Sequence, residues 1–228
     1  MALYAIGDLH LCLGEDKPMD IFGGAWTGYM EKLEKGIAQI GPEDTTVLLG
    51  DLSWALDLSG AREDFDWINR IPGRKIILKG NHDYWWSTAA KFYKFCQDNG
   101  FQNQWILNNN HYEYEGWAIC GTRGWFFEEN RSGAHDEKVF KRELMRLESS
   151  LRSAGDLPKM VFLHYPPRYR GYACEPILEL LERYQVSRCF YGHLHGASHG
   201  LAMEGLWNGT EFCLVSADKL GFVPFRVI

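Results

Sequence analysis

The chain has 228 residues, of which 46 % are hydrophobic and 14 % are aromatic, and this apolar content is enough to fill the core of one large domain. Its 24 lysines and arginines are outnumbered by 30 aspartates and glutamates, giving a formal net charge of -6. This charge argues against extended nucleic-acid binding and confines any phosphate chemistry to a local site. We therefore predict a single domain over residues 1–228.

Short apolar runs alternate with amphipathic segments along the first half of the chain, which predicts strands alternating with helices. In chain order we expect a strand at 3–6, a helix at 29–40, strands at 46–49 and 75–78, and a helix at 87–99. Ser87 is the expected N-cap of that second helix, and Gly100 its C-terminal stop.

The second half continues the alternation with a helix at 136–153, a strand at 160–163, a helix at 175–184 and a strand at 188–191. Two regions break it, 105–122 and 201–228, because turn residues such as Gly116 and Asn208-Gly209 separate their strand-like runs. Each predicts antiparallel hairpins. The expected architecture is layered α/β with mixed sheets.

The six cysteines lie singly along the chain, without a C-x-x-C pair. Reduced and mostly buried thiols are therefore expected, as in a cytoplasmic protein. The first residues lack the pattern of a signal peptide, and no apolar run approaches the roughly 20 residues that cross a bilayer. We expect a cytoplasmic protein that does not associate with membranes.

Each of the five predicted parallel-type strands is followed at once by side chains that can bind metal ions. The clusters are Gly-Asp-Leu-His at 7–10, Gly-Asp-Leu-Ser at 50–53, Gly-Asn-His-Asp at 80–83, His-Tyr-Pro-Pro at 164–167 and Gly-His-Leu-His at 192–195. Ligands of open α/β sheets bind beyond the carboxyl ends of the strands, so we expect the clusters to meet at one site. The glycine that opens four of these clusters allows a sharp turn or a close backbone approach.

Two pairs in these clusters, Asp8 with His10 and His193 with His195, are two residues apart and therefore project to the same side of an extended chain. The full set of candidate metal ligands is Asp8, His10, Asp51, Asn81, His164, His193 and His195. Seven nitrogen and oxygen ligands are too many for one tetrahedral ion. They suit two ions that share a bridging carboxylate.

The ordered motifs D-x-H, G-D, G-N-H-D, H and G-H-x-H resemble the signature of the calcineurin-like metallophosphoesterase superfamily, and they run from Asp8 to His195. The resemblance implies a four-layer α/β/β/α sandwich of two mixed β-sheets flanked by helices. It also implies that Asp8, His10, Asp51 and His195 hold the first metal ion, and that Asn81, His164 and His193 hold the second with Asp51 as the bridge. His82 would then stand beside the metal ions.

This resemblance implies hydrolysis of a phosphomonoester or phosphodiester of a small molecule or nucleotide by a metal-bridging hydroxide. Two ions lower the pKa of a shared water and neutralise the charge that develops during displacement. His82 would donate a proton to the leaving oxygen or stabilise the phosphoryl charge, and Asp83 would orient His82 and keep it protonated. Imidazole, carboxylate and amide ligands without a thiolate allow Mn, Fe, Zn, Co or Ni, and of these we expect Mn or an Fe/Zn pair.

Loops expected near the same rim contain further candidates. Arg123 is our first candidate for binding a substrate phosphate, because it closely follows a strand-like run and lies between two glycines. Arg168 and Arg170 are weaker candidates for the same role. The aromatic residues near the motifs either pack in the core or line the substrate pocket, and these are Trp54, Tyr84, Trp85 and Trp86.

The sequence departs from one branch of the family at the second motif. Protein phosphatases continue it as G-D-x-V-D-R-G, whereas this chain reads Gly50-Asp-Leu-Ser-Trp54 and lacks the arginine. A phosphoprotein phosphatase is therefore disfavoured. A non-catalytic scaffold on the same fold and a nuclease remain as alternatives, although retention of His82 counts against the scaffold and the net charge against the nuclease. The substrate, the native metal ions and the oligomeric state are left open.

Overall fold

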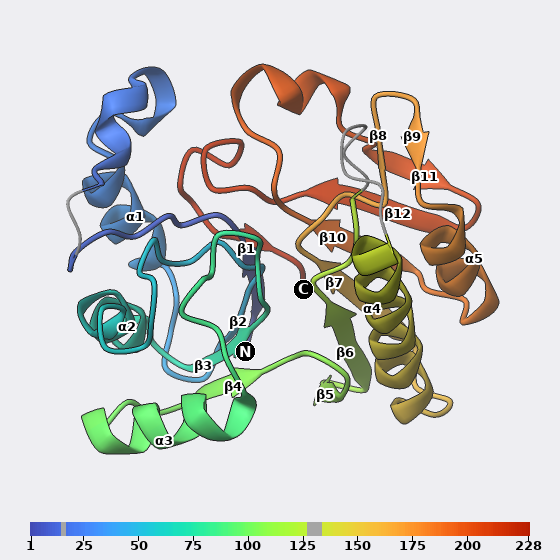
Figure 1. The fold of residues 1–228 in the computed structure, drawn as a ribbon, viewed down its shortest axis with the longest axis horizontal. Coiled ribbons are helices and arrows are strands. Elements are labelled where there is room, and N and C mark those ends of the chain that lie inside the picture. Colours follow the sequence, from blue (N-terminus) through green and yellow to red (C-terminus); the bar gives the residue numbers. More distant parts are fainter. Residues whose placement is uncertain (15–16, 127–133) are drawn as a thin grey trace. The chain divides into compact units, whose positions relative to one another are not determined.

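The computed structural model describes residues 1–14, 17–126 and 134–228. The chain forms two compact units: unit 1 comprises Met1–Ile106 and Val215–Ile228, and unit 2 comprises Leu107–Leu214. Each unit has its own mixed sheet and its own helices (Figure 1). The predicted α/β class, with two mixed sheets flanked by helices, is confirmed. The single domain predicted over residues 1–228 stays a prediction.

Unit 1 is built on a five-stranded sheet in which one edge strand runs antiparallel to the others. In spatial order its strands are β13 (Phe225–Arg226), β1 (Leu3–Ile6), β2 (Thr45–Leu48), β3 (Arg74–Ile77) and β4 (Gln104–Ile106). Its helices are η1 (Met19–Phe22), η2 (Gly24–Trp26), α1 (Tyr29–Ile37), α2 (Arg62–Arg70) and α3 (Ala89–Asn99). Leu33, Phe65 and Phe92 of these helices join Ile6 and Leu48 of the sheet in one apolar core.

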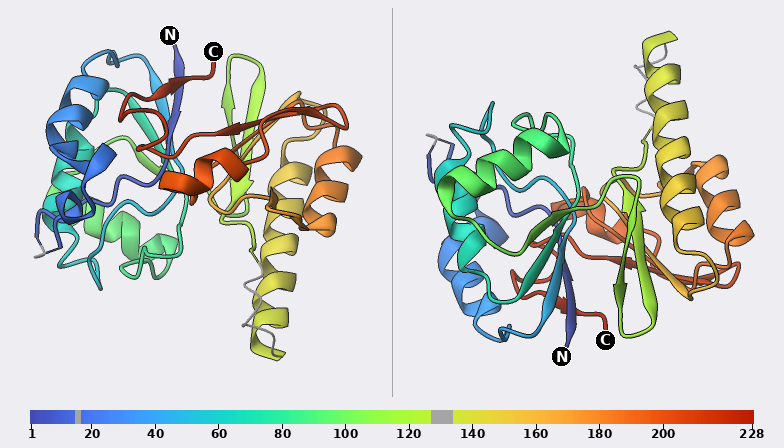
Figure 2. Two further views of the ribbon diagram at one scale, coloured as in Figure 1. Left: turned by 90° about the horizontal axis from the view of Figure 1, so that it is seen from above. Right: turned by 90° about the horizontal axis from the view of Figure 1, so that it is seen from below.

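Unit 2 is built on a six-stranded sheet with antiparallel pairs at both edges. In spatial order its strands are β11 (Gly205–Trp207), β12 (Thr210–Leu214), β10 (Arg188–Tyr191), β7 (Lys159–Leu163), β6 (Trp117–Thr122) and β5 (His111–Tyr114). Its other elements are α4 (Ala134–Ser153), the small pair β8 (Arg168–Tyr169) and β9 (Tyr172–Ala173), α5 (Glu175–Arg183) and η3 (Gly196–Leu201). Figure 2 shows α4 and α5 side by side along this sheet, and Leu147 and Leu181 bury their side chains in the core with Val161.

The predicted strands agree with the structure to within one or two residues at each end. The hairpins β5–β6 and β11–β12 are also confirmed, with left-handed backbone at Gly116 and at Asn208-Gly209. Residues 105–106 were expected in a hairpin but belong to β4, which pairs in parallel with β3. The predicted N-cap Ser87 is wrong by one residue, since Thr88 accepts the hydrogen bond from Lys91 N. Helix α2 was not predicted.

None of the helices in the described ranges combines the length and the apolar composition that a membrane span requires. All six cysteines are free, and four of them are buried, as expected for reduced thiols.

Each unit has a buried lysine, Lys75 in β3 and Lys159 in β7, that donates hydrogen bonds to the loop preceding its own strand. Lys75 Nζ donates to the carbonyls of Ile71 and Gly73 at 2.9 and 3.0 Å, and Lys159 Nζ donates to Gly155 and Leu157 at 2.7 and 2.8 Å. The acceptors lie four and two residues before the lysine in each case. Burial lowers the pKa of Lys75 to about 8. Each ammonium therefore satisfies carbonyls that the preceding helix and its turn leave unpaired.

We expect Lys75→Met to lower the free energy of unfolding by about 1–3 kcal/mol, because it leaves both carbonyls without a donor. Urea denaturation at neutral pH measures this change. Lys91→Met, which alters an exposed lysine of α3, is the control and should change stability by less than about 0.5 kcal/mol. Equal midpoints for the two variants would show that the lysine contributes nothing to stability.

Candidate metal site

The loops that follow β1 and β2 run side by side and carry three of the predicted ligands. Asp8 N donates to Gly50 O, and His10 N donates to Asp51 O, both at 2.9 Å. Asp8, His10 and Asp51 all have left-handed backbone, with φ of 60°, 47° and 50°. This conformation is uncommon for residues other than glycine and is concentrated at functional sites. The hydrogen bonds between the two loops therefore hold these three residues in a strained backbone conformation.

Two glycines allow the loop after β3 to approach the loop after β2. A Cβ on Gly50 would lie 2.4 Å from Gly80 N, and a Cβ on Gly80 would lie 2.0 Å from Asp51 Oδ1. Neither position has space for a side chain. The expectation that a glycine opens these clusters to permit close backbone approach is confirmed at Gly50 and Gly80.

The carboxylate of Asp83 joins these two loops. One oxygen accepts from Asp51 N at 2.8 Å and from Gly80 N at 2.6 Å. The other accepts from Leu52 N at 2.8 Å and from Trp85 Nε1 at 2.9 Å. Asp83 is fully buried. A single carboxylate thus fixes the backbone of Asp51 relative to the turn that presents Asn81.

These bonds differ from the role expected for Asp83. Its oxygens are occupied by the two loops and by Trp85, and His82 Nδ1 is buried without a hydrogen-bond partner among the described residues. The structure therefore lacks the expected bond by which Asp83 would orient His82. What holds His82 is its backbone N, which donates to Asp51 Oδ1 at 2.8 Å, and the aromatic rings around its side chain.

Unit 1 concentrates buried negative charge at these loops. Asp8, Asp51 and Asp83 are each at most 1 % exposed. Burial, and after it the nearby carboxylate of Asp51, raises the pKa of Asp83 to about 6. Buried like charges are unfavourable unless a cation compensates them, so this arrangement fits a bound metal ion.

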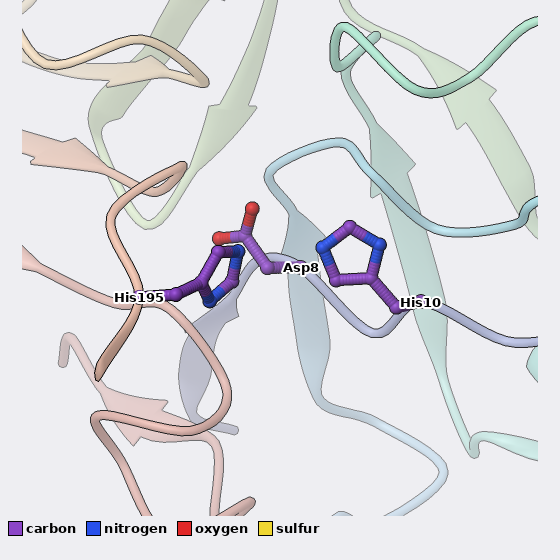
Figure 3. A group of neighbouring side chains, drawn as sticks. All are labelled: Asp8, His10 and His195. Atoms are coloured by element: carbon purple, nitrogen blue, oxygen red, sulfur yellow. The ribbon is translucent and has the colours of Figure 1, made fainter. Parts of the chain in front are cut away.

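The spacing of possible ligand atoms in unit 1 supports the same conclusion. Asp8 and His10 each offer a ligand atom, and these atoms lie within 4.8 Å of each other. His10 Nε2 lies 3.9 Å from Asp51 Oδ2. Figure 3 shows the side chains of Asp8 and His10 on the loop after β1, and His195 after β10. A carboxylate and an imidazole at this separation can bind one ion together.

Unit 2 carries the other three histidines that were predicted as ligands, on the loops after β7 and β10, and these are His164, His193 and His195. The backbone joins these loops, because Gly192 N donates to His164 O at 3.1 Å. The rings of His164 and His193 are 5.2 Å apart, and their ligand nitrogens lie within 4.8 Å of each other. His193 has left-handed backbone, with φ of 72°. The structure thus brings together His164 and His193, which were expected to bind the same ion.

Arg123 lies beside His164 in unit 2. Its carbonyl accepts from His164 N at 3.1 Å, and its guanidinium lies 3.6 Å from the buried carboxylate of Glu143. Glu143 also accepts from Thr122 Oγ1 at 2.8 Å and from Arg146 at 2.6 Å. The side chain of Arg123 is therefore anchored near a predicted ligand, and its role in phosphate binding stays a prediction.

The three aromatic residues at positions 84–86 differ in burial. Trp85 belongs to the core of unit 1 and packs edge-on against Phe65, and Trp86 is partly buried against the same core. Tyr84 is 54 % exposed, and its ring lies 6.1 Å from that of His82. Of these three residues, Tyr84 is therefore the one that is both exposed and next to His82.

Two further arginines were named as candidates for phosphate binding. Arg168 and Arg170 are both exposed, and Arg168 lies over the ring of Trp207 at 5.7 Å. Residues 127–131 of the loop that begins at Thr122 lie outside the described residues.

Asp64 supports these loops and was missed in the sequence. Its buried carboxylate accepts from Leu13 N at 2.7 Å and from Ser53 Oγ, so it links the loops after β1 and β2 to α2. Asp64 lies on the face of α2 that buries Phe65 and Ile68. A carboxylate within an apolar helical stripe was the available signal.

We expect Asp83→Asn to lower the free energy of unfolding by about 2–4 kcal/mol, because an amide nitrogen would face backbone donors that now have a carboxylate. Denaturation in the presence of a chelator measures this effect apart from metal binding. Asp66→Asn alters an exposed carboxylate of α2 and should change stability by less than about 0.5 kcal/mol. A stability loss no larger than that of Asp66→Asn would contradict the proposed linkage of the two loops.

Comparisons with known proteins agree with the fold and the motifs. The structure resembles the phosphopantetheinyl hydrolase of Mycobacterium tuberculosis, with 16% identity and a TM-score of 0.60 over 100% of this chain and 95% of that one. It also resembles a protein of unknown function from Aquifex aeolicus, with 16% identity and a TM-score of 0.52 over 99% and 95% of the two chains. A Thermus thermophilus protein gives 15% identity and a TM-score of 0.55 over 85% and 81%.

These identities are low, so the solved structures show a shared fold alone. No curated protein matches the sequence. The sequence profile described as calcineurin-like phosphoesterase matches residues 1–197, which include all seven predicted metal ligands. The chain therefore belongs to the calcineurin-like phosphoesterase family.

Proposed function

We propose that this protein is a metal-dependent phosphohydrolase that cleaves a phosphomonoester or phosphodiester bond in a small-molecule or nucleotide substrate. The observation that carries the proposal is the strained loop pair of unit 1. In this pair the loops that carry Asp8, His10 and Asp51 are joined by main-chain hydrogen bonds, and the ring of His82 lies 5.9 Å from that of His10, which supports the proposal that they act together. The family membership supports the same reaction class.

The residues present fit two metal ions. We propose that Asp8, His10, Asp51 and His195 bind one ion, and that Asn81, His164 and His193 bind the other with Asp51 shared. Their chemistry supports this assignment, because carboxylate, amide and imidazole ligands suit Mn or an Fe/Zn pair. When bound, the ions supply positive charge for the phosphoryl oxygens and lower the pKa of a nearby water.

His82 is the proton donor in this proposal. It does not belong to the proposed ligand set, and its backbone N is fixed by Asp51 Oδ1 at 2.8 Å. An imidazole can be protonated near neutral pH, so it can transfer a proton to the leaving oxygen as the P–O bond breaks. Asp83 contributes indirectly, because it fixes the loops that carry Asp51 and Asn81.

We further propose that Arg123 binds a substrate phosphate oxygen, and that the protein is cytoplasmic. The anchored guanidinium beside His164 supports the first, and the free thiols support the second. The net charge of -6 favours a compact substrate over an extended nucleic acid.

Added metal should stabilise the folded protein. Binding to the native state raises the free energy of unfolding by about 2.7 kcal/mol when the free ion is at 100 times its Kd. We expect Mn²⁺ to raise the melting temperature of chelator-treated protein, and Asp51→Asn to reduce this rise. Asp66→Asn should retain the full rise. A melting temperature that does not depend on any divalent ion would contradict the metal site.

The manganese-loaded protein should hydrolyse an aryl phosphate ester, and His82→Ala should lower kcat for an alkyl phosphate ester by about 100-fold or more, because a positioned acid contributes 10²–10⁴-fold where the leaving oxygen needs a proton. Steady-state kinetics with matched monoesters, diesters, nucleotides and a phosphopantetheinyl ester measure this effect and define the substrate class. His111→Ala, which alters a histidine outside the predicted motifs, is the control. Absence of turnover with every metal and substrate would favour the non-catalytic scaffold.

A further inference from the structure

The side chain of Trp54 contacts both functional histidines of unit 1. Its ring is stacked on that of His10, with centroids 5.0 Å apart and planes at 24°. It is also 4.6 Å from the ring of His82. His10 is a proposed metal ligand and His82 the proposed proton donor, so one indole contacts both.

The backbone fixes the position of Trp54 relative to these histidines. Trp54 N donates to Leu11 O at 3.0 Å, and Leu11 N donates to Leu52 O at 2.9 Å. These bonds extend the pairing between the loops after β1 and β2 as far as Trp54. Lys17 Nζ lies 5.4 Å from the centre of the indole. The indole is therefore held in place by the loops that carry the ligands.

Hydrogen bonds do not account for the orientation of the His82 ring. Within the part of the chain that the structure describes, His82 Nδ1 is buried and has no hydrogen-bond partner. The Asp83 carboxylate is occupied by other donors. The ring instead contacts His10, Trp54 and Tyr84, and Trp54 is the nearest of the three.

From these contacts we propose that Trp54 is a positioning residue that orients His82 for proton transfer, in place of a carboxylate hydrogen-bonded to His82. This inference rests on the proposed function of His82. The contact between the two rings predicts what loss of the indole should do. Packing restricts the imidazole to one orientation, so loss of the indole should impair the step that needs a proton donor.

The choice of leaving group tests this inference. A poor alkoxide leaving group needs protonation, whereas a good aryloxide leaving group needs it much less. We expect Trp54→Ala to lower kcat for an alkyl phosphate ester by about tenfold or more and to affect a matched p-nitrophenyl ester much less. Trp54→Phe keeps an aromatic ring and should retain kcat to within about threefold.

A double-mutant cycle then tests whether Trp54 acts through His82. For the alkyl ester, kcat of the double variant Trp54→Ala/His82→Ala should equal that of His82→Ala, because residues that act as a unit are not additive. Trp105→Ala removes a partly exposed indole of β4 from the same unit and is the matched control. Equal losses for both esters, or fully additive losses in the double variant, would overturn the inference.

A second measurement does not depend on activity. NMR spectra of ¹⁵N-histidine-labelled, chelator-treated protein report nuclear Overhauser contacts between the rings of His82 and Tyr84. We expect these contacts in the wild type and in Trp54→Phe, and their loss in Trp54→Ala. Their retention in Trp54→Ala would refute the positioning role. Absence of wild-type turnover would refute the proposed function instead, so the two failures are distinguishable.

Discussion

The buried carboxylate of Asp83 is the interaction on which the candidate site of unit 1 depends. It accepts backbone hydrogen bonds from Asp51 and Leu52 on one loop and from Gly80 on another. A charged acceptor makes stronger bonds than a neutral one, especially where water is excluded. The loops approach so closely that Gly50 and Gly80 have no space for a Cβ. Asp83 holds these loops together, and they carry the proposed ligands Asp51 and Asn81.

The same constraint explains why His82 needs another means of orientation. Asp83 is adjacent to His82 in sequence, but its oxygens are directed to backbone donors and to Trp85. Trp54 packs on the imidazole where a carboxylate hydrogen bond was expected. An aromatic contact fixes the plane of a ring without adding another negative charge beside Asp8 and Asp51. This placement suits a site that already concentrates buried carboxylates.

Much of the fold could be predicted from the sequence because the strands that carry the motifs are short apolar runs bounded by glycine and polar residues. The order of motifs after those strands identified the candidate ligands. Helix α2 was overlooked because its apolar stripe is short and includes a carboxylate, Asp64, which weakens the helical pattern. Asp83 was expected to orient His82, as a carboxylate does for other catalytic histidines, whereas the turn directs its side chain to the backbone of Asp51 and Leu52. Such long-range hydrogen bonds depend on tertiary structure and leave no local pattern.

We propose above all that this chain binds two metal ions, with ligands from the loops after β1, β2, β3, β7 and β10. Anomalous diffraction from crystals of the manganese-loaded protein tests it most directly. We predict two anomalous peaks, both within bonding distance of the Asp51 carboxylate, one next to Asp8 and His10 and the other next to Asn81, His164 and His193. A map without peaks at Asp51, or with manganese bound only at other residues, would contradict the account.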